Sequence, residues 1–306
     1  MTTQALQSLK DFDLNVADVF LWVFRRTRTA AKYSADYVPT NETLDDALRG
    51  FALTERNRIT EWVPYSHLSQ TTENGCLSVD ATETNFESLK VLADRPETEH
   101  AVNSLAKLKG STGYLVKFVA DGSTLYAMRR SPSTWKPAYK KKGVINTIFR
   151  NGELSAVEDV DFTIEPGLDF FALDDALLIG NKRGFESMMQ YRAGYVQAFE
   201  ELREAPEFVA IFTDMAPLVE HVGQNGTHLR RMAVIQEKGF YNDPAYLGAL
   251  KTVCDKHQWG IGFDASGRII PTAETAAVIM KLLLDQRLVS EITQIMYDVP
   301  DGTPVP

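Results

Sequence analysis

The chain has 306 residues, of which 44% are hydrophobic, so it is long enough to bury one or two cores. Its formal net charge is −9, which taken as a total argues against nucleic-acid binding, because a duplex-binding protein usually carries a basic surface. The longest apolar run, Val19 to Phe24, is too short to cross a bilayer, and the first residues lack a signal-peptide pattern. We therefore expect a globular cytoplasmic protein whose two cysteines, Cys76 and Cys254, are reduced thiols.

The first third of the chain mixes strand and helix patterns. Val19 to Phe24 has the length and composition of a core strand. Asn41 is a good cap for a helix with apolar residues at helical spacing, and a further helix is predicted from a Thr98 cap to Gly110. Residues 1–110 are thus expected to form an N-terminal α/β region.

From Gly113 the hydrophobic period changes from helical to extended. The turns between the apolar runs are short, so the strands they join must be antiparallel, and residues 113–180 are predicted to form a β-meander. Its predicted strands are Tyr114–Val119, Leu125–Arg129, Val144–Phe149, Phe162–Ile164, Phe170–Leu173 and Leu177–Ile179.

Residues 181–306 are expected to be mainly helical. Asn181 caps a predicted helix whose apolar stripe, from Phe185 to Leu202, should cover one face of the sheet. The Met and aromatic side chains of this stripe suit a core better than a ligand pocket. Later elements are helices over Thr227–Gly239, from Asp243 and from Thr272, with a hairpin over Ile261–Ile270.

The predicted fold class is therefore α+β. An antiparallel β-meander is packed by helices, with an N-terminal α/β region and a mainly helical C-terminal part. Residues 111–306 would form the second domain. The order of helices and hairpin near the C-terminus is also compatible with a winged-helix-like unit.

Charge is segregated along the middle of the chain. Ser111 to Arg150 holds eight Lys and Arg against one Asp, a balance of +7, whereas Asn151 to Gly180 holds eight acidic residues and no basic one, a balance of −8. The two segments could pair across the meander, or the basic segment could form a face for phosphates. The sequence leaves both interpretations open.

The connection from Arg129 to Lys142 places Trp135 and Tyr139 among six cations, a composition suited to a phosphate backbone with stacked bases. A solvated loop is the alternative. Further cations follow the first strand at Arg25, Arg26, Arg28 and Lys32. The predicted DNA-binding residues are Arg129, Arg130, Lys136, Lys140, Lys141, Lys142, Lys182, Arg183, Arg230 and Arg231.

Common nucleotide-binding and hydrolase motifs are missing from the sequence. The nearest approach to a metal site is the group Asp214, Glu220, His221 and His228, which shares no helical spacing. The pair Asp174 and Asp175 fits a turn. We predict no catalytic residue, no metal site and no cofactor.

Three stretches carry a resemblance to a known family: YLVKFVADGSTLYAMRR at 114–130, LDFFALDDALLIGNKRGFESMMQYR at 168–192 and LVSEITQIMYDVP at 288–300. They resemble the Kiwa KwaB-like family over about the last two thirds of the chain. The resemblance implies a bacterial anti-phage protein that binds DNA without reading its sequence and restrains phage DNA replication.

The same resemblance implies a partner and a location. The chain would be the cytoplasmic subunit of a two-component complex, held at the inner membrane by the membrane protein KwaA, and is expected to form a homodimer. Two alternatives stay open: a metal-dependent nuclease using Asp174, Asp175 or Asp264, and a non-catalytic scaffold that docks through Glu158, Asp159 and Asp161.

Overall fold

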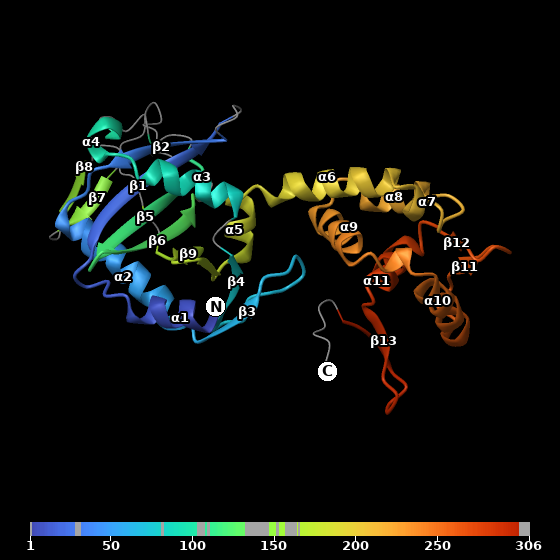
Figure 1. The fold of residues 1–306 in the computed structure, drawn as a ribbon. Helices are drawn as coiled ribbons and strands as arrows, with labels where there is room; N and C mark the ends of the chain where they lie inside the picture. The colour runs from blue at the N-terminus through green and yellow to red at the C-terminus, as the bar shows by residue number, and fades with distance from the viewer. Residues whose placement is uncertain are drawn as a thin grey trace. The chain divides into compact units, whose positions relative to one another are not determined.

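The chain folds into two compact units, Met1–Tyr65 with Gln70–Met189, and Ser66–Ser69 with Gln190–Pro306. Figure 1 shows a sheet in the first unit and mostly helices in the second. The computed structural model describes residues 2–27, 32–80, 83–102, 108, 111–131, 147–150, 153–156, 164 and 166–299. Within these ranges, no helix is both long and apolar enough to cross a membrane.

An eight-stranded sheet forms the centre of the first unit, with strand order β2-β1-β5-β6-β9-β10-β4-β3. Only β3 and β4 pair in parallel; the other neighbours are antiparallel. The run β5-β6-β9-β10 confirms the predicted meander, and β1 confirms the predicted first strand. The bounds are β1 Asp18–Arg26, β2 Tyr33–Val38, β3 Glu61–Pro64, β4 Gly75–Asp80, β5 Gly113–Ala120, β6 Ser123–Arg130, β9 Phe170–Leu173 and β10 Ala176–Ile179.

The chain leaves this sheet after β6 and returns to it at β9, so that Met128 pairs directly with Phe170. The predicted strand Val144–Phe149 is present as β7 (Thr147–Arg150), but β7 pairs with β8 (Glu153–Ala156) in a separate two-stranded sheet. Its assignment to the meander is therefore wrong. Of the predicted strand Phe162–Ile164, only Ile164 lies within the described residues.

Helices cover both faces of the sheet. On one face, α1 (Thr2–Asp11) and α2 (Glu42–Arg58) bury Leu9 and Leu48 in one cluster with Val23 of β1. On the other, the ring of Phe170 lies 6.2 Å from Phe86 of α3 (Thr84–Ala93) and 5.1 Å from Phe185 of α5 (Lys182–Met188). The predicted α+β class is confirmed.

Residue 110 does not divide the compact units, because β1 pairs with β5 across that point of the chain. The helix predicted from Thr98 to Gly110 does not run on unbroken from its start. The described residues there form the single turn α4 (Glu97–His100), which ends because Ala101 is extended and bridges to Tyr37 of β2. Residues 103–107, 109 and 110 lie outside the described part.

The helix predicted from Asn181 is split in two. The Asn181 side chain caps α5 as expected, but Gln190 adopts a left-handed conformation with φ 60°, and α6 (Tyr191–Glu204) begins after it. Phe185 is buried in the first unit, whereas Leu202 belongs to the core of the second. The prediction that one stripe covers the sheet therefore holds only for α5.

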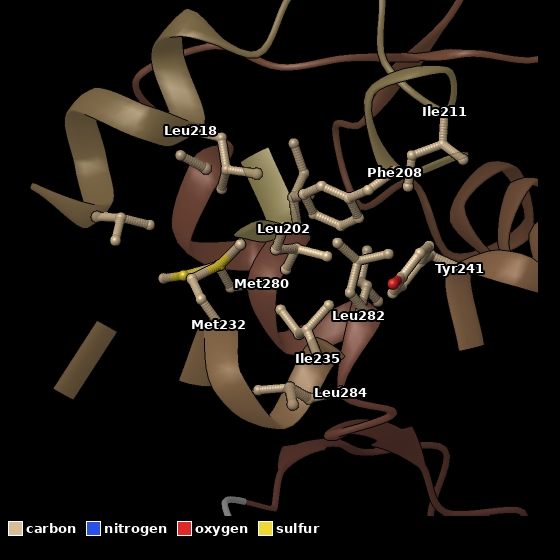
Figure 2. Close-up of a cluster of buried hydrophobic side chains, with 14 of the residues drawn as sticks. Leu202, Phe208, Ile211, Leu218, Met232, Ile235, Tyr241, Met280, Leu282 and Leu284 are labelled. Carbon is tan, nitrogen blue, oxygen red and sulfur yellow. The ribbon is translucent and has the colours of Figure 1, made fainter. Parts of the chain in front are cut away.

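The second unit is mainly helical, as predicted. Asn225 caps α9, Gly239 ends it in a left-handed conformation, and Asp243 caps α10. Figure 2 shows Leu202, Met232 and Met280 converging in its core. The remaining elements are α7 Pro206–Val209, α8 Ala216–Val222, α9 Gly226–Lys238, η2 Phe240–Asn242, α10 Pro244–His257, α11 Ala276–Leu283, and the hairpins β11 Gly262–Phe263 with β12 Ile269–Ile270 and β13 Arg287–Val289 with β14 Met296–Asp298.

A pair of glycine substitutions tests the packing of the first unit. A Cβ at Gly113 would lie 2.6 Å from the carbonyl oxygen of Arg129 and 2.7 Å from the ring of Phe24, so Gly113→Ala should lower the free energy of unfolding by about 1–3 kcal/mol. Gly50 of α2 has open space around it, so Gly50→Ala should raise that free energy by about 0.5–1 kcal/mol. Urea unfolding followed by circular dichroism measures both; equal effects would contradict the packing.

Candidate nucleic-acid interface

Three predicted DNA-binding residues come together at one end of the first unit's sheet. Arg129 and Arg130 end β6, and Arg183 lies in α5, far along the sequence. Together with Ser131, Asp169 and Asn181 they line a recess of about 330 Å³, referred to below as the arginine recess. Its lining side chains are all polar.

Asp169 fixes the arrangement of the arginine recess. Its carboxylate accepts a hydrogen bond from the backbone N–H of Arg130 (2.6 Å) and one from Nδ2 of Asn181 (2.7 Å). Its own backbone N–H donates to the carbonyl of Met128 (2.7 Å), and its carbonyl accepts from Gly180 and Asn181. One residue therefore joins the end of β6, the start of β9 and the start of α5.

The Asp169 side chain is only 6% exposed, and this burial raises the pKa of its carboxyl group above the usual aspartate value. The hydrogen bonds from Arg130 and Asn181, and the positive charges of Arg129 and Arg130, act in the opposite direction. The arginines thus compensate part of the cost of burying a carboxylate.

Two glycines allow close approach at this site. A Cβ at Gly184 would overlap the carboxylate of Asp169, so only glycine lets α5 pass this close. A Cβ at Gly167, where φ is +104°, would come within 2.5 Å of Nη1 of Arg129, which donates to the carbonyl of Pro166. The Asp169 carboxylate and the Arg129 guanidinium thus each lie against a glycine, where any side chain would collide with them.

The guanidinium groups of Arg130 and Arg183 face solvent. Both residues are exposed, and within the described part of the chain neither side chain donates to a protein acceptor. Each guanidinium carries five N–H donors in a planar fork that matches phosphate oxygens. The arginine recess can therefore offer directed donors to an anion.

Lys182 does not join its neighbour Arg183. Its ammonium lies 3.8 Å from the buried carboxylate of Glu186 and 5.3 Å above the ring of Tyr65. Arg26 ends β1, which pairs with β5, and its backbone N–H donates to the hydroxyl of Thr112. Arg25 pairs with Asp36 at 2.7 Å, and Arg28 lies outside the described residues.

Arg230 and Arg231 lie on α9 of the second unit, where the Arg230 guanidinium sits 5.6 Å from the ring of Tyr195. This pair therefore belongs to the second unit, whereas the residues of the arginine recess belong to the first. The predicted residues Lys136, Lys140, Lys141 and Lys142 lie outside the described part of the chain.

The alternative that the basic and acidic segments form ion pairs with each other can be checked at two described residues, Lys117 and Asp169. Lys117 of β5 pairs with Asp94, outside the acidic segment, at 2.7 Å. Asp169 belongs to the acidic segment and lies among the arginines, but its hydrogen bonds come from a backbone N–H and an amide.

Candidate metal ligands are dispersed or occupied. In the described ranges, no group of three His, Cys, Asp or Glu residues could hold a metal ion. Asp174 occupies a left-handed turn position between β9 and β10, and the Asp264 carboxylate accepts four hydrogen bonds from Ser266 and Arg268. His221 and His228 do come together, with stacked rings 4.4 Å apart.

Sequence reasoning missed Asp169 as a site residue because the charge count placed it in the acidic segment. Asn181 was identified only as a helix cap, although its side chain both caps α5 and binds Asp169. Gly184 gave no signal beyond its place within a helix. The caps could be read locally, whereas the pairing of Asp169 with Arg130 depends on the tertiary fold.

The raised pKa of Asp169 predicts a pH-dependent contribution to stability. A carboxyl whose pKa is higher in the folded than in the unfolded state favours folding below its unfolded value of about 3.9, and this contribution is lost as the pH rises through the folded value. The difference in unfolding free energy, native minus Asp169→Asn, should therefore fall with rising pH across that window. Urea unfolding at several pH values measures it, and a difference that rises with pH would contradict the burial of this group.

Comparison with known proteins bears on the family. The comparison with curated proteins finds no match, and neither does the comparison with solved structures. A family model described as "Kiwa protein KwaB-like" matches residues 108–293, more than half of the chain, and includes the three arginines of the recess. The chain therefore belongs to the Kiwa KwaB-like family and is a Kiwa anti-phage defence protein.

Proposed function

We propose that this protein is the DNA-binding subunit of a two-protein Kiwa complex. It binds DNA without reading its sequence and assembles with the membrane protein KwaA at the cytoplasmic face of the inner membrane. By holding DNA there, it restrains phage DNA replication. Two copies in a homodimer would double the number of phosphate contacts and so strengthen a modest site.

The observation that carries the DNA proposal is the meeting of Arg129, Arg130 and Arg183 around one polar recess. Contacts of arginine with phosphates supply affinity that is independent of base sequence, because every nucleotide presents the same group. An acidic protein can bind DNA in this way if its cations are concentrated on one surface.

The basic connection after Ser131 supports the same proposal from the sequence. The sequence that follows Ser131, a residue lining the arginine recess, contains four lysines together with Trp135 and Tyr139. Lysines would contact phosphates, and aromatic rings would stack on unpaired bases. Arg230 and Arg231 belong to the other unit and would form a secondary contact.

We propose further that the protein acts by binding and not by catalysis. Asp264 has its carboxylate oxygens occupied by Ser266 and Arg268, and Asp174 serves a turn, which disfavours both as metal ligands. Plasmid DNA incubated with the protein and Mg²⁺ or Mn²⁺ should stay intact, as judged by gel electrophoresis. Cleavage by the native chain that an Asp174→Asn, Asp175→Asn or Asp264→Asn variant lacks would establish the nuclease alternative.

Substitution of recess arginines should change the salt dependence of DNA binding. We expect Arg130→Gln combined with Arg183→Gln to reduce the slope of log K against log salt by about 2, because each lost phosphate contact removes about 0.9. Fluorescence anisotropy with a labelled duplex across a salt series measures this slope. The loss should be the same for duplexes of unrelated sequence.

The matched control is Arg95→Gln, which removes one exposed cation of the first unit that follows α3. It should leave the slope nearly unchanged. A triple variant, Lys140→Glu with Lys141→Glu and Lys142→Glu, tests the basic connection separately. If both the arginine and the lysine variants bind DNA as tightly as the native chain, the DNA contact lies neither at the arginine recess nor at these lysines.

A further inference from the structure

We propose that the arginine recess binds a phosphate monoester, the group found at a phosphorylated DNA end or on a mononucleotide. This inference rests on the proposed DNA function for its biological ligand, but it concerns a particular chemical group. Contacts along a DNA backbone require only a positive surface. A recess that favours a terminal phosphate would distinguish ends from continuous strand.

The charge of the recess favours a monoester. Its lining holds three guanidinium groups and one carboxylate, a net charge of +2. A phosphate monoester carries about −1.5 to −2 at neutral pH. Each phosphodiester within a strand carries one negative charge, so it would leave the recess incompletely neutralised.

The donors approach from two separate elements. Arg129 and Arg130 come from the end of β6, and Arg183 comes from α5. A terminal phosphate has three oxygens that are free to accept, which suits several arginine forks at once. At about 330 Å³, the recess falls at the lower end of the size range of small-molecule sites.

The base of the recess is organised before any ligand arrives. Asp169 is held by the backbone of Arg130 and by Asn181, and Gly184 has no side chain that would displace its carboxylate. Its negative charge offsets the mutual repulsion of the neighbouring guanidinium groups. Such preorganisation reduces the entropy lost on binding.

A purely structural ion cluster would use these donors differently. In that case the guanidinium groups would donate directly to the Asp169 carboxylate, as in a buried ion pair. Instead, its two oxygens accept from a backbone N–H and an amide, and among described residues the side chains of Arg130 and Arg183 have no protein acceptor. Their hydrogen-bonding capacity is left for a ligand.

The test compares duplexes of one sequence that carry phosphate or hydroxyl groups at their ends, with a fluorophore on an internal base. The native chain should bind the phosphorylated duplex about tenfold more tightly, a difference of about 1.4 kcal/mol. Arg183→Gln should bring the two affinities close together, whereas Arg95→Gln should preserve the ratio. Because Arg183 is exposed, its loss should leave the fold intact, which circular dichroism verifies.

A second arm uses deoxyadenosine monophosphate and deoxyadenosine with the full chain, read by hydrogen exchange at β6 and α5. Slower exchange with deoxyadenosine monophosphate but not with deoxyadenosine supports the proposal. This holds even if no duplex binds and the proposed DNA binding is wrong. Equal affinity for both duplexes, with no protection by the nucleotide, overturns it and leaves sequence-independent DNA binding standing. A preference for phosphorylated duplex ends without nucleotide protection assigns the site to DNA ends.

Discussion

The buried carboxylate of Asp169 is the interaction on which the candidate site depends. It is connected through its backbone and side chain to the end of β6, to the turn after β10 and to the cap of α5. These bonds bring Arg130 and Arg183 together although they lie far apart in the sequence. Without the acid at this point, the three neighbouring arginines would lose the negative charge that offsets their mutual repulsion.

The same constraint explains how an acidic chain can present a cationic site. The segregation of charge along the sequence is not kept at this site, because Asp169 of the acidic segment lies among the arginines of the recess. One acid organises the site, and the surplus positive charge remains for a ligand. Local distribution, not the net charge of −9, therefore determines which anions this protein can bind.

Local signals in the sequence were sufficient for several elements. Asn41 and Asn181 were predicted as caps, a helix was predicted from Asp243, and short turns were predicted between the antiparallel strands. The break at Gln190 was not, because glutamine favours helix and only its tertiary setting imposes a left-handed conformation. The pairing of β6 with β9 was hidden for a similar reason: it joins strands separated by a long excursion of the chain.

Hydrogen–deuterium exchange with and without a duplex shows whether DNA contacts the arginine recess, since it locates the contact without any substitution. We expect slower exchange at residues 126–131 and 181–188 when DNA is bound, with little change at β3 or β4. Protection confined to the second unit, around Arg230 and Arg231, would contradict the assignment of the DNA contact to the arginine recess.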